Sequence, residues 1–161
     1  MSKWIFLLRH AQSAGKQAGQ RDYDRVLTPE GEEQARKTGF LFMRNSIRPE
    51  FILSSSALRA KATAEKVNDY LHLPPACLSF REEFYEAFLN TWIDGIKHLP
   101  KEINNVLCVG HNPVISGLAS EFSKQPIDLP PSGFALFESD SVSWPEFDNH
   151  LRQINLALNA S

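Results

Sequence analysis

Short apolar runs alternate with helical patterns along this chain, and this alternation limits the possible folds more than any other feature. The runs lie at residues 4–8, 51–53 and 106–109, and each has a length typical of a buried strand. Helical patterns follow them at about residues 28–45, 57–71 and 113–122, with another at about 87–98. Such an order predicts an α/β fold, a three-layer αβα sandwich with a largely parallel central sheet and helices on both faces. Residues 133–138 and 151–156 are expected to form later strands.

The first helix carries clear start signals. Thr28 can cap it and Pro29 suits its first position. Gly31, Ala35 and Gly39 recur every four residues and form a narrow face of very small side chains. Because glycine costs a helix about 1 kcal/mol relative to alanine, this face predicts close packing against the sheet.

The later helices have weaker start signals. Serines 54–56 offer several possible caps for the second helix, and Asn112 and Pro113 are expected to cap and open the last one. The second helix should bury one stripe of its surface, formed by Ala60, Ala64, Val67 and Leu71.

Length and composition exclude several classes of protein. The 161 residues predict a single domain, residues 1–161, and we expect a monomer. The net charge of -2 gives no reason to expect nucleic acid or an anionic membrane as a partner. No apolar run approaches the roughly 20 residues that cross a bilayer. Cys77 and Cys108 form neither a CxxC pair nor a disulfide framework, so we expect a cytoplasmic protein.

A cationic or histidine side chain follows each of the three apolar runs. Arg9 and His10 end the first run, Arg59 lies a few residues beyond the second, and His111 comes just after the third. Because the carboxyl ends of parallel strands meet at one edge of a sheet, these side chains are expected to converge. Arginine presents a fork of donors that suits phosphate, and two nearby helix N-termini add positive dipole. The sequence therefore predicts a pocket for a dianion, with phosphate as the obvious ligand.

Residues 11–26 form a long polar loop between the first strand and the first helix. Unstructured loops of this length are uncommon and are often functional. The alternative is a flexible surface loop without a functional role.

Four motifs in this order resemble the histidine phosphatase superfamily. They are Leu8-Arg9-His10-Ala11-Gln12-Ser13, Leu27-Thr28-Pro29-Glu30-Gly31, Ser55-Ser56-Ala57-Leu58-Arg59-Ala60-Lys61-Ala62-Thr63 and Val109-Gly110-His111-Asn112-Pro113. The small size and the Arg-His-Ala-x-Ser form resemble the SixA-like phosphohistidine phosphatases. The resemblance implies a phosphoglycerate-mutase-like fold.

The resemblance also implies roles for individual residues. His10 would be the nucleophile that accepts the phosphoryl group, while Arg9, Arg59 and His111 would bind its oxygens. Ser13 and Arg25 match positions that border the phosphate, although a turn cap and a solvated loop charge are the plainer interpretations. No cofactor and no metal is expected, and the sequence contains no HExxH or aspartate-rich metal motif.

The general acid is the least defined position. Glu86 resembles the place from which many members of the superfamily supply an acid, and Glu82 and Glu83 are near enough to compete. Two departures from the common motif stand close to His10: Ala11 replaces a usual glycine, and Gln12 replaces a frequent acidic residue.

These features lead to one main hypothesis and two alternatives. We expect a phosphatase that works through a phosphohistidine intermediate and removes phosphate from phosphohistidine on a protein, such as a phosphotransfer domain. The first alternative is a phosphatase of a small phosphorylated metabolite. The second is a module that binds phosphate or phosphohistidine without turnover.

Overall fold

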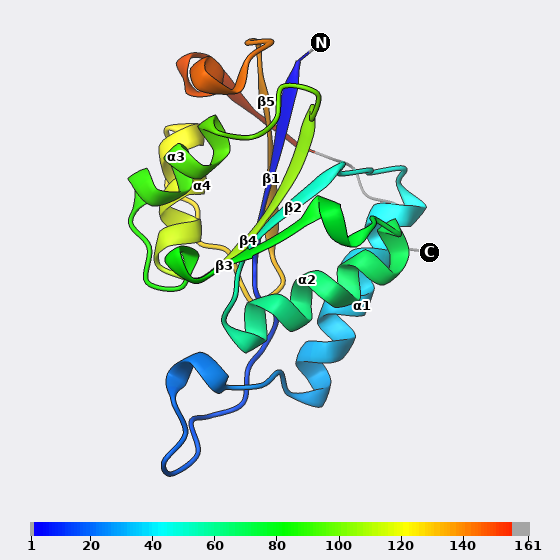
Figure 1. The fold of residues 1–161 in the computed structure, drawn as a ribbon, viewed down its shortest axis with the longest axis vertical. Coiled ribbons are helices and arrows are strands. Elements are labelled where there is room, and N and C mark those ends of the chain that lie inside the picture. Colours follow the sequence, from blue (N-terminus) through cyan, green and yellow to red (C-terminus); the bar gives the residue numbers. More distant parts are fainter. Residues whose placement is uncertain (1, 156–161) are drawn as a thin grey trace.

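The computed structural model describes residues 2–155, in which six strands form one sheet between helices (Figure 1). The strands are β1 (Lys3–Arg9), β2 (Phe51–Ser55), β3 (Leu78–Arg81), β4 (Asn105–Gly110), β5 (Phe134–Ser139) and β6 (Leu151–Ile154). Their order across the sheet is β3-β2-β4-β1-β5-β6. The first four pair in parallel, and β5 runs antiparallel to both β1 and β6. The predicted α/β fold with a largely parallel sheet is confirmed.

Two of the strands differ from the sequence-based expectation. The short edge strand β3 was not predicted, because its residues are all half-buried and form no continuous apolar run. The last strand was expected at residues 151–156, and the structure places β6 at Leu151–Ile154; residue 156 lies outside the described residues.

The central strands are apolar because both of their faces are covered. In β1, Ile5 and Leu7 point to one face of the sheet and Phe6 and Leu8 to the other, and all four are buried. Helices α1 (Pro29–Arg44) and α2 (Leu58–Leu71) lie on one side of the sheet. Helices α3 (Leu89–Lys97) and α4 (Val114–Ser123) lie on the other side (Figure 1), so the predicted three layers are confirmed.

Helix α1 starts as predicted but uses its small residues differently. The Thr28 hydroxyl accepts a hydrogen bond from Gly31 N at 2.9 Å, and Pro29 occupies the first turn. The prediction that the small face packs on the sheet was wrong. A Cβ at Gly39 would meet the Tyr70 ring and the backbone of Val67 on α2, and a Cβ at Gly31 would run into the Gln12 carbonyl. The glycines therefore let α1 approach a neighbouring helix and the segment that follows β1.

The caps expected for helices α2 and α4 also differ from those in the structure. Helix α2 begins after Ala57 with no side-chain cap, because the serines before it make other bonds. At α4 the capping position is held by Pro113, and the peptide bond between Asn112 and Pro113 is cis. The Asn112 amide oxygen still accepts from Ser116 N at 3.2 Å, so Asn112 supports the first turn from one residue further out.

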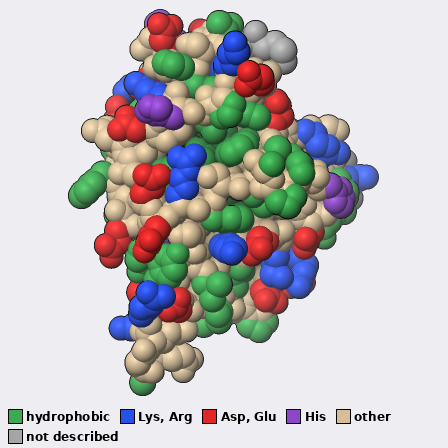
Figure 2. Space-filling view, viewed as in Figure 1, with side chains coloured by type: hydrophobic (Ala, Val, Ile, Leu, Met, Phe, Trp, Pro, Cys, Tyr) green, Lys and Arg blue, Asp and Glu red, His purple; other side chains and the backbone are tan. Residues whose placement is uncertain are grey.

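On the face that Figure 2 shows, acidic and basic side chains are interspersed, so neither sign of charge dominates it. Among residues 2–155, no helix is both long and apolar enough to span a membrane.

The contact between α1 and the segment after β1 predicts that Gly31→Ala destabilises the protein. The added methyl group meets the Gln12 carbonyl, which is held in place because it accepts from Thr28 N at 3.1 Å. Overpacking of about 1–3 kcal/mol should outweigh the gain of about 1 kcal/mol in helix propensity. Urea unfolding should show a lower midpoint for Gly31→Ala than for the wild type. Gly15→Ala is the control, since a Cβ there meets nothing within 4 Å. Equal midpoints for Gly31→Ala and wild type would contradict the packing.

Candidate active site

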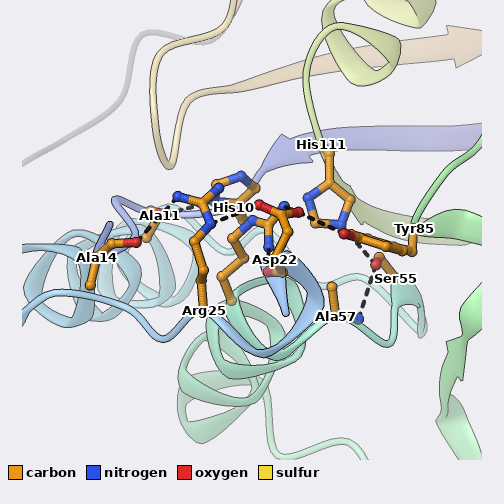
Figure 3. Close-up of polar contacts among 10 residues, drawn as sticks. His10, Ala11, Ala14, Asp22, Arg25, Ser55, Ala57, Tyr85 and His111 are labelled. Atoms are coloured by element: carbon orange, nitrogen blue, oxygen red, sulfur yellow. Dashed lines mark hydrogen bonds and ion pairs between the residues drawn. The ribbon is translucent and has the colours of Figure 1, made fainter. Parts of the chain in front are cut away.

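Parallel pairing brings the two predicted histidines together. Arg9 of β1 lies opposite Gly110 of β4, so the next residues, His10 and His111, leave the sheet side by side. Their ring centroids are 5.1 Å apart. The loop before β5 closes the same edge, because His10 O accepts from Ser132 N at 3.1 Å. Figure 3 shows both imidazoles facing the residues of the long loop.

The hydrogen bonds of His10 define which ring nitrogen is free. The Nδ1 atom lies 2.7 Å from the Ala11 carbonyl, which can only accept, so Nδ1 carries the proton and Nε2 keeps its lone pair. Burial lowers the pKa of His10 to about 4, and the Arg59 and Arg9 guanidinium groups act in the same direction. A neutral imidazole with a free Nε2 is the form that a nucleophile needs.

Arg59 is buried in the first turn of α2, and its charge is met by the long loop. Its Nη1 donates to the Asp22 carbonyl at 2.7 Å and its Nη2 donates to Asp22 Oδ2 at 3.0 Å. A carboxylate of the chain therefore balances part of the Arg59 charge. The Thr63 hydroxyl donates to Arg59 O and accepts from Ala11 N, and so connects the first turn of α2 to the residue after His10.

Asp22 is the centre of a second set of contacts that the sequence did not reveal. Its carboxylate accepts from Tyr85 Oη at 2.6 Å and from Arg25 Nε at 2.9 Å, besides Arg59 (Figure 3). The Tyr85 hydrogen bond, with the Arg59 and Arg25 charges, lowers the pKa of Asp22 to about 2. Asp22 is therefore an anion that holds one end of the Arg59 guanidinium. The loop at residues 11–26 contributes directly to the site.

Three buried nitrogen atoms in this site have no hydrogen-bond partner among the described residues. They are Arg9 Nε, Arg59 Nε and His111 Nδ1. A buried donor without a partner costs about 1–3 kcal/mol, and both arginine Nε atoms can only donate, so the site favours a ligand that offers acceptor oxygens. All three atoms belong to residues that the sequence predicted as phosphate ligands.

The remaining predicted residues lie around this cluster. Arg25 borders the site, and its Nη1 also donates to Ala14 O at 3.2 Å. Ser13 forms an isolated bridge with Leu27 and so ties the two ends of the loop; a phosphate contact of its hydroxyl stays a prediction. Glu86 is exposed and lines a small cavity of about 140 Å³ together with Tyr85 and His111.

The two competing acids are placed differently from Glu86. Glu83 lies 3.6 Å from Arg81 in an ion pair. Neither Glu82 nor Glu83 belongs to the lining of the cavity that touches His111. Glu86 is thus the one of these three carboxylates that lines the same cavity as His111.

A backbone carbonyl of the loop at 128–131 holds the arginine of the first motif. Arg9 Nη1 donates to Leu129 O at 3.1 Å, and Asn112 Nδ2 donates to the same carbonyl at 3.2 Å. This carbonyl therefore connects the first and the last motif. Among residues 2–155 the structure contains no group of three or more His, Cys, Asp or Glu side chains arranged to hold a metal ion.

An α/β sheet that collects two buried histidines, the buried Arg59 and the half-buried Arg9 at its strand ends is suited to binding and transferring a phosphoryl group. The family model of the histidine phosphatase superfamily (branch 1) matches residues 5–96. The chain belongs to this superfamily, and membership implies phosphatase activity.

Individual relatives agree with this assignment. The chain is 29% identical over 157 residues to an uncharacterized chloroplastic protein of Arabidopsis thaliana, covering 91% of this chain and 71% of the relative. It is 44% identical over 70 residues to the mitochondrial serine/threonine-protein phosphatase PGAM5 of Xenopus tropicalis, which covers 44% of this chain and only 24% of that protein.

Solved structures are similar over almost the whole chain. SixA from Agrobacterium tumefaciens matches with a TM-score of 0.82 and 26% identity, over 96% of this chain and 97% of that one. The protein histidine phosphatase SixA solved with tungstate has a TM-score of 0.80 and covers 94% of each chain, and its 24% identity supports the fold alone.

The two lowered histidine pKa values predict how stability depends on pH. Burial lowers the pKa of His111 to about 3 and that of His10 to about 4, whereas an unfolded histidine titrates near 6.5. Between these values the unfolded chain binds more protons than the folded one, so stability is full above about pH 6.5 and falls as the pH drops. Each histidine should contribute about 1.4 kcal/mol per pH unit in that window.

Urea unfolding at several pH values between 7 and 5 measures this effect. His10→Gln should lose less stability per pH unit than the wild type. His150→Gln, at an exposed position, is the control and should follow the wild type. Parallel curves for His10→Gln and wild type would mean that His10 is not held neutral by the fold.

Proposed function

We propose that this protein is a metal-independent phosphatase in which His10 forms a phosphohistidine intermediate. The observation that carries the proposal is the set of three buried, unpartnered nitrogens of Arg9, Arg59 and His111, together with a neutral His10 imidazole whose Nε2 is free. Phosphoryl transfer requires positioning and charge stabilisation more than any other contribution, and these groups can provide both.

The proposed reaction has two steps. His10 Nε2 attacks the phosphorus atom, the bond from phosphorus to the leaving group breaks, and the leaving group departs with the bonding electrons. Arg9, Arg59 and His111 hold the phosphoryl oxygens, and Glu86 gives a proton to a leaving group that needs one. In the second step the oxygen of water bonds to phosphorus, the N–P bond breaks and its electrons restore the lone pair of Nε2. One proton of the water returns to Glu86 where Glu86 gave one up, and otherwise stays on the departing orthophosphate.

We propose phosphohistidine on a protein, such as a phosphotransfer domain, as the substrate class. Support comes from the similarity to SixA over nearly the full chain and from the exposure of the Glu86 side chain to solvent at the edge of the site. A small phosphorylated metabolite is the first alternative, and a binding module without turnover is the second. The segment shared with PGAM5, a serine/threonine-protein phosphatase, favours testing phosphoserine and phosphothreonine proteins too. A cytoplasmic, monomeric protein without nucleic acid or membrane partners completes the proposal.

A phosphate-release assay separates these possibilities. The substrates to compare are a phosphohistidine protein, phosphoserine and phosphothreonine peptides, and a panel of phosphorylated metabolites. We expect the highest kcat/KM with the phosphohistidine protein. A preference for a metabolite would overturn the substrate class but keep the enzyme, and binding without release on any substrate would favour the module.

The nucleophile assignment predicts a covalent intermediate at His10. After a quench without acid, phosphorus from the substrate should be found on His10, in a bond that acid breaks and alkali spares. His10→Ala should show neither label nor turnover. Radiolabelling followed by peptide mapping is the measurement, with His98→Ala as a surface control. Label on a serine, or turnover in His10→Ala, would refute the assignment.

The acid assignment predicts that Glu86→Gln acts selectively. A general acid contributes about a hundred- to ten-thousandfold when the leaving group is a poor one. Alkyl phosphates should therefore lose at least about a hundredfold in kcat, whereas nitrophenyl phosphate and phosphohistidine should be almost unaffected. Glu83→Gln is the matched control, because that carboxylate is paired with Arg81. Equal losses on all three substrates would show that Glu86 shapes the site and does not donate the proton.

A further inference from the structure

Ser55, the last residue of β2, lies against the histidine that the family resemblance assigns to phosphate binding. Its side chain is fully buried, and its Oγ is 2.8 Å from His111 Nε2 and 3.1 Å from Ala57 N (Figure 3). The sequence suggested only that serines 54–56 might cap α2. In the structure, Ser55 connects the start of that helix to the imidazole of His111.

The directions of these two hydrogen bonds follow from the atoms involved. A backbone N–H can only donate, so Ser55 Oγ accepts from Ala57. The hydroxyl has one proton of its own, and within the described part of the chain the only acceptor recorded beside it is His111 Nε2. Ser55 therefore donates to Nε2, which must be the unprotonated nitrogen of a neutral ring.

The proton of His111 is then left on Nδ1. This atom is buried and, like Arg9 Nε and Arg59 Nε, has no hydrogen-bond partner among the described residues. The opposite tautomer would leave the buried Ser55 proton without an acceptor and turn a lone pair toward the oxygens of a phosphoryl group. Those oxygens can only accept, so the Nδ1–H tautomer is the neutral form that binds them.

We propose that Ser55 is a positioning residue that fixes His111 as the Nδ1–H tautomer and so aims its N–H at the phosphoryl group. The inference rests on the proposed function, because it assumes that the group bound there is a phosphoryl group. The Tyr85 ring packs against the imidazole at 80°, with the two centroids 5.7 Å apart, and so limits the rotation of the His111 ring.

Two readouts distinguish this role from ordinary packing. The first is the protonation of the His111 ring in ¹⁵N-labelled protein, read from long-range ¹H–¹⁵N correlations and assigned by their loss in His111→Gln. The wild type should carry its proton on Nδ1, and Ser55→Ala should populate the Nε2–H form.

The second readout is the pH profile of kcat/KM. Ser55→Ala should lose about tenfold to a hundredfold at neutral pH, less than the hundred- to thousandfold that follows outright removal of a donor. The loss should stay constant from about pH 8 to pH 5, because burial lowers the pKa of His111 to about 3 and the ring stays neutral over this range. Titratable and charged groups from several elements face His111 and take part in this profile; they are His10, Arg25, Arg59, Asp22, Tyr85 and Glu86.

Ser139→Ala is the matched control. Ser139 is equally buried on β5, donates to Phe147 O at 2.7 Å and accepts from Ser141 N at 3.1 Å, and its hydrogen bonds do not involve the site. It should change neither the His111 spectrum nor the pH profile.

An Nε2–H tautomer in the wild type overturns the proposal, and so does an unchanged His111 spectrum in Ser55→Ala. If Ser55→Ala does not fold, the wild-type spectrum alone decides between the two tautomers. A wild-type protein that releases no phosphate from any substrate would refute the proposed function instead, and it leaves the tautomer measurement unaffected.

Discussion

The parallel pairing of β1 with β4 is the interaction on which the site depends. It places Arg9 beside Gly110, and the residues that follow become a pair of facing imidazoles. A register slip of one residue would turn every side chain of β1 to the opposite face and separate the histidines. Both faces of β1 and β4 are buried in the two apolar clusters, so the close packing of individual side chains on each face opposes a slipped pairing.

The same burial gives the site its chemistry. Removal of water keeps His10 and His111 neutral and leaves donor nitrogens of Arg9 and Arg59 without partners. Such an arrangement destabilises the folded protein, and the apolar sheet and helices offset that cost. Asp22 reduces this cost further, because its carboxylate pairs with Nη2 at one end of the Arg59 guanidinium. The Nε atom of Arg59 is still left without a partner.

Local patterns predicted the sheet, the helices and the convergence of Arg9, His10, Arg59 and His111. The prediction was possible because strand ends can be recognised from apolar runs, and parallel strands place their ends at one edge. The partners of these residues could not be found in this way. Asp22 meets Arg59 across 37 positions of the chain and Ser55 meets His111 across 56, so nothing in the local sequence marks either pair. The strand β3 was missed because its pairing with β2, more than its own composition, makes it a strand.

A crystal structure of the protein with orthovanadate, a mimic of the phosphoryl group in transfer, tests the central claim most directly. We predict that vanadium lies within bonding reach of His10 Nε2. Its oxygens should accept hydrogen bonds from Arg9 Nε, Arg59 Nε and His111 Nδ1, with Asp22 still on the far end of Arg59. Vanadate bound elsewhere, with these three donors left without partners, would contradict the account.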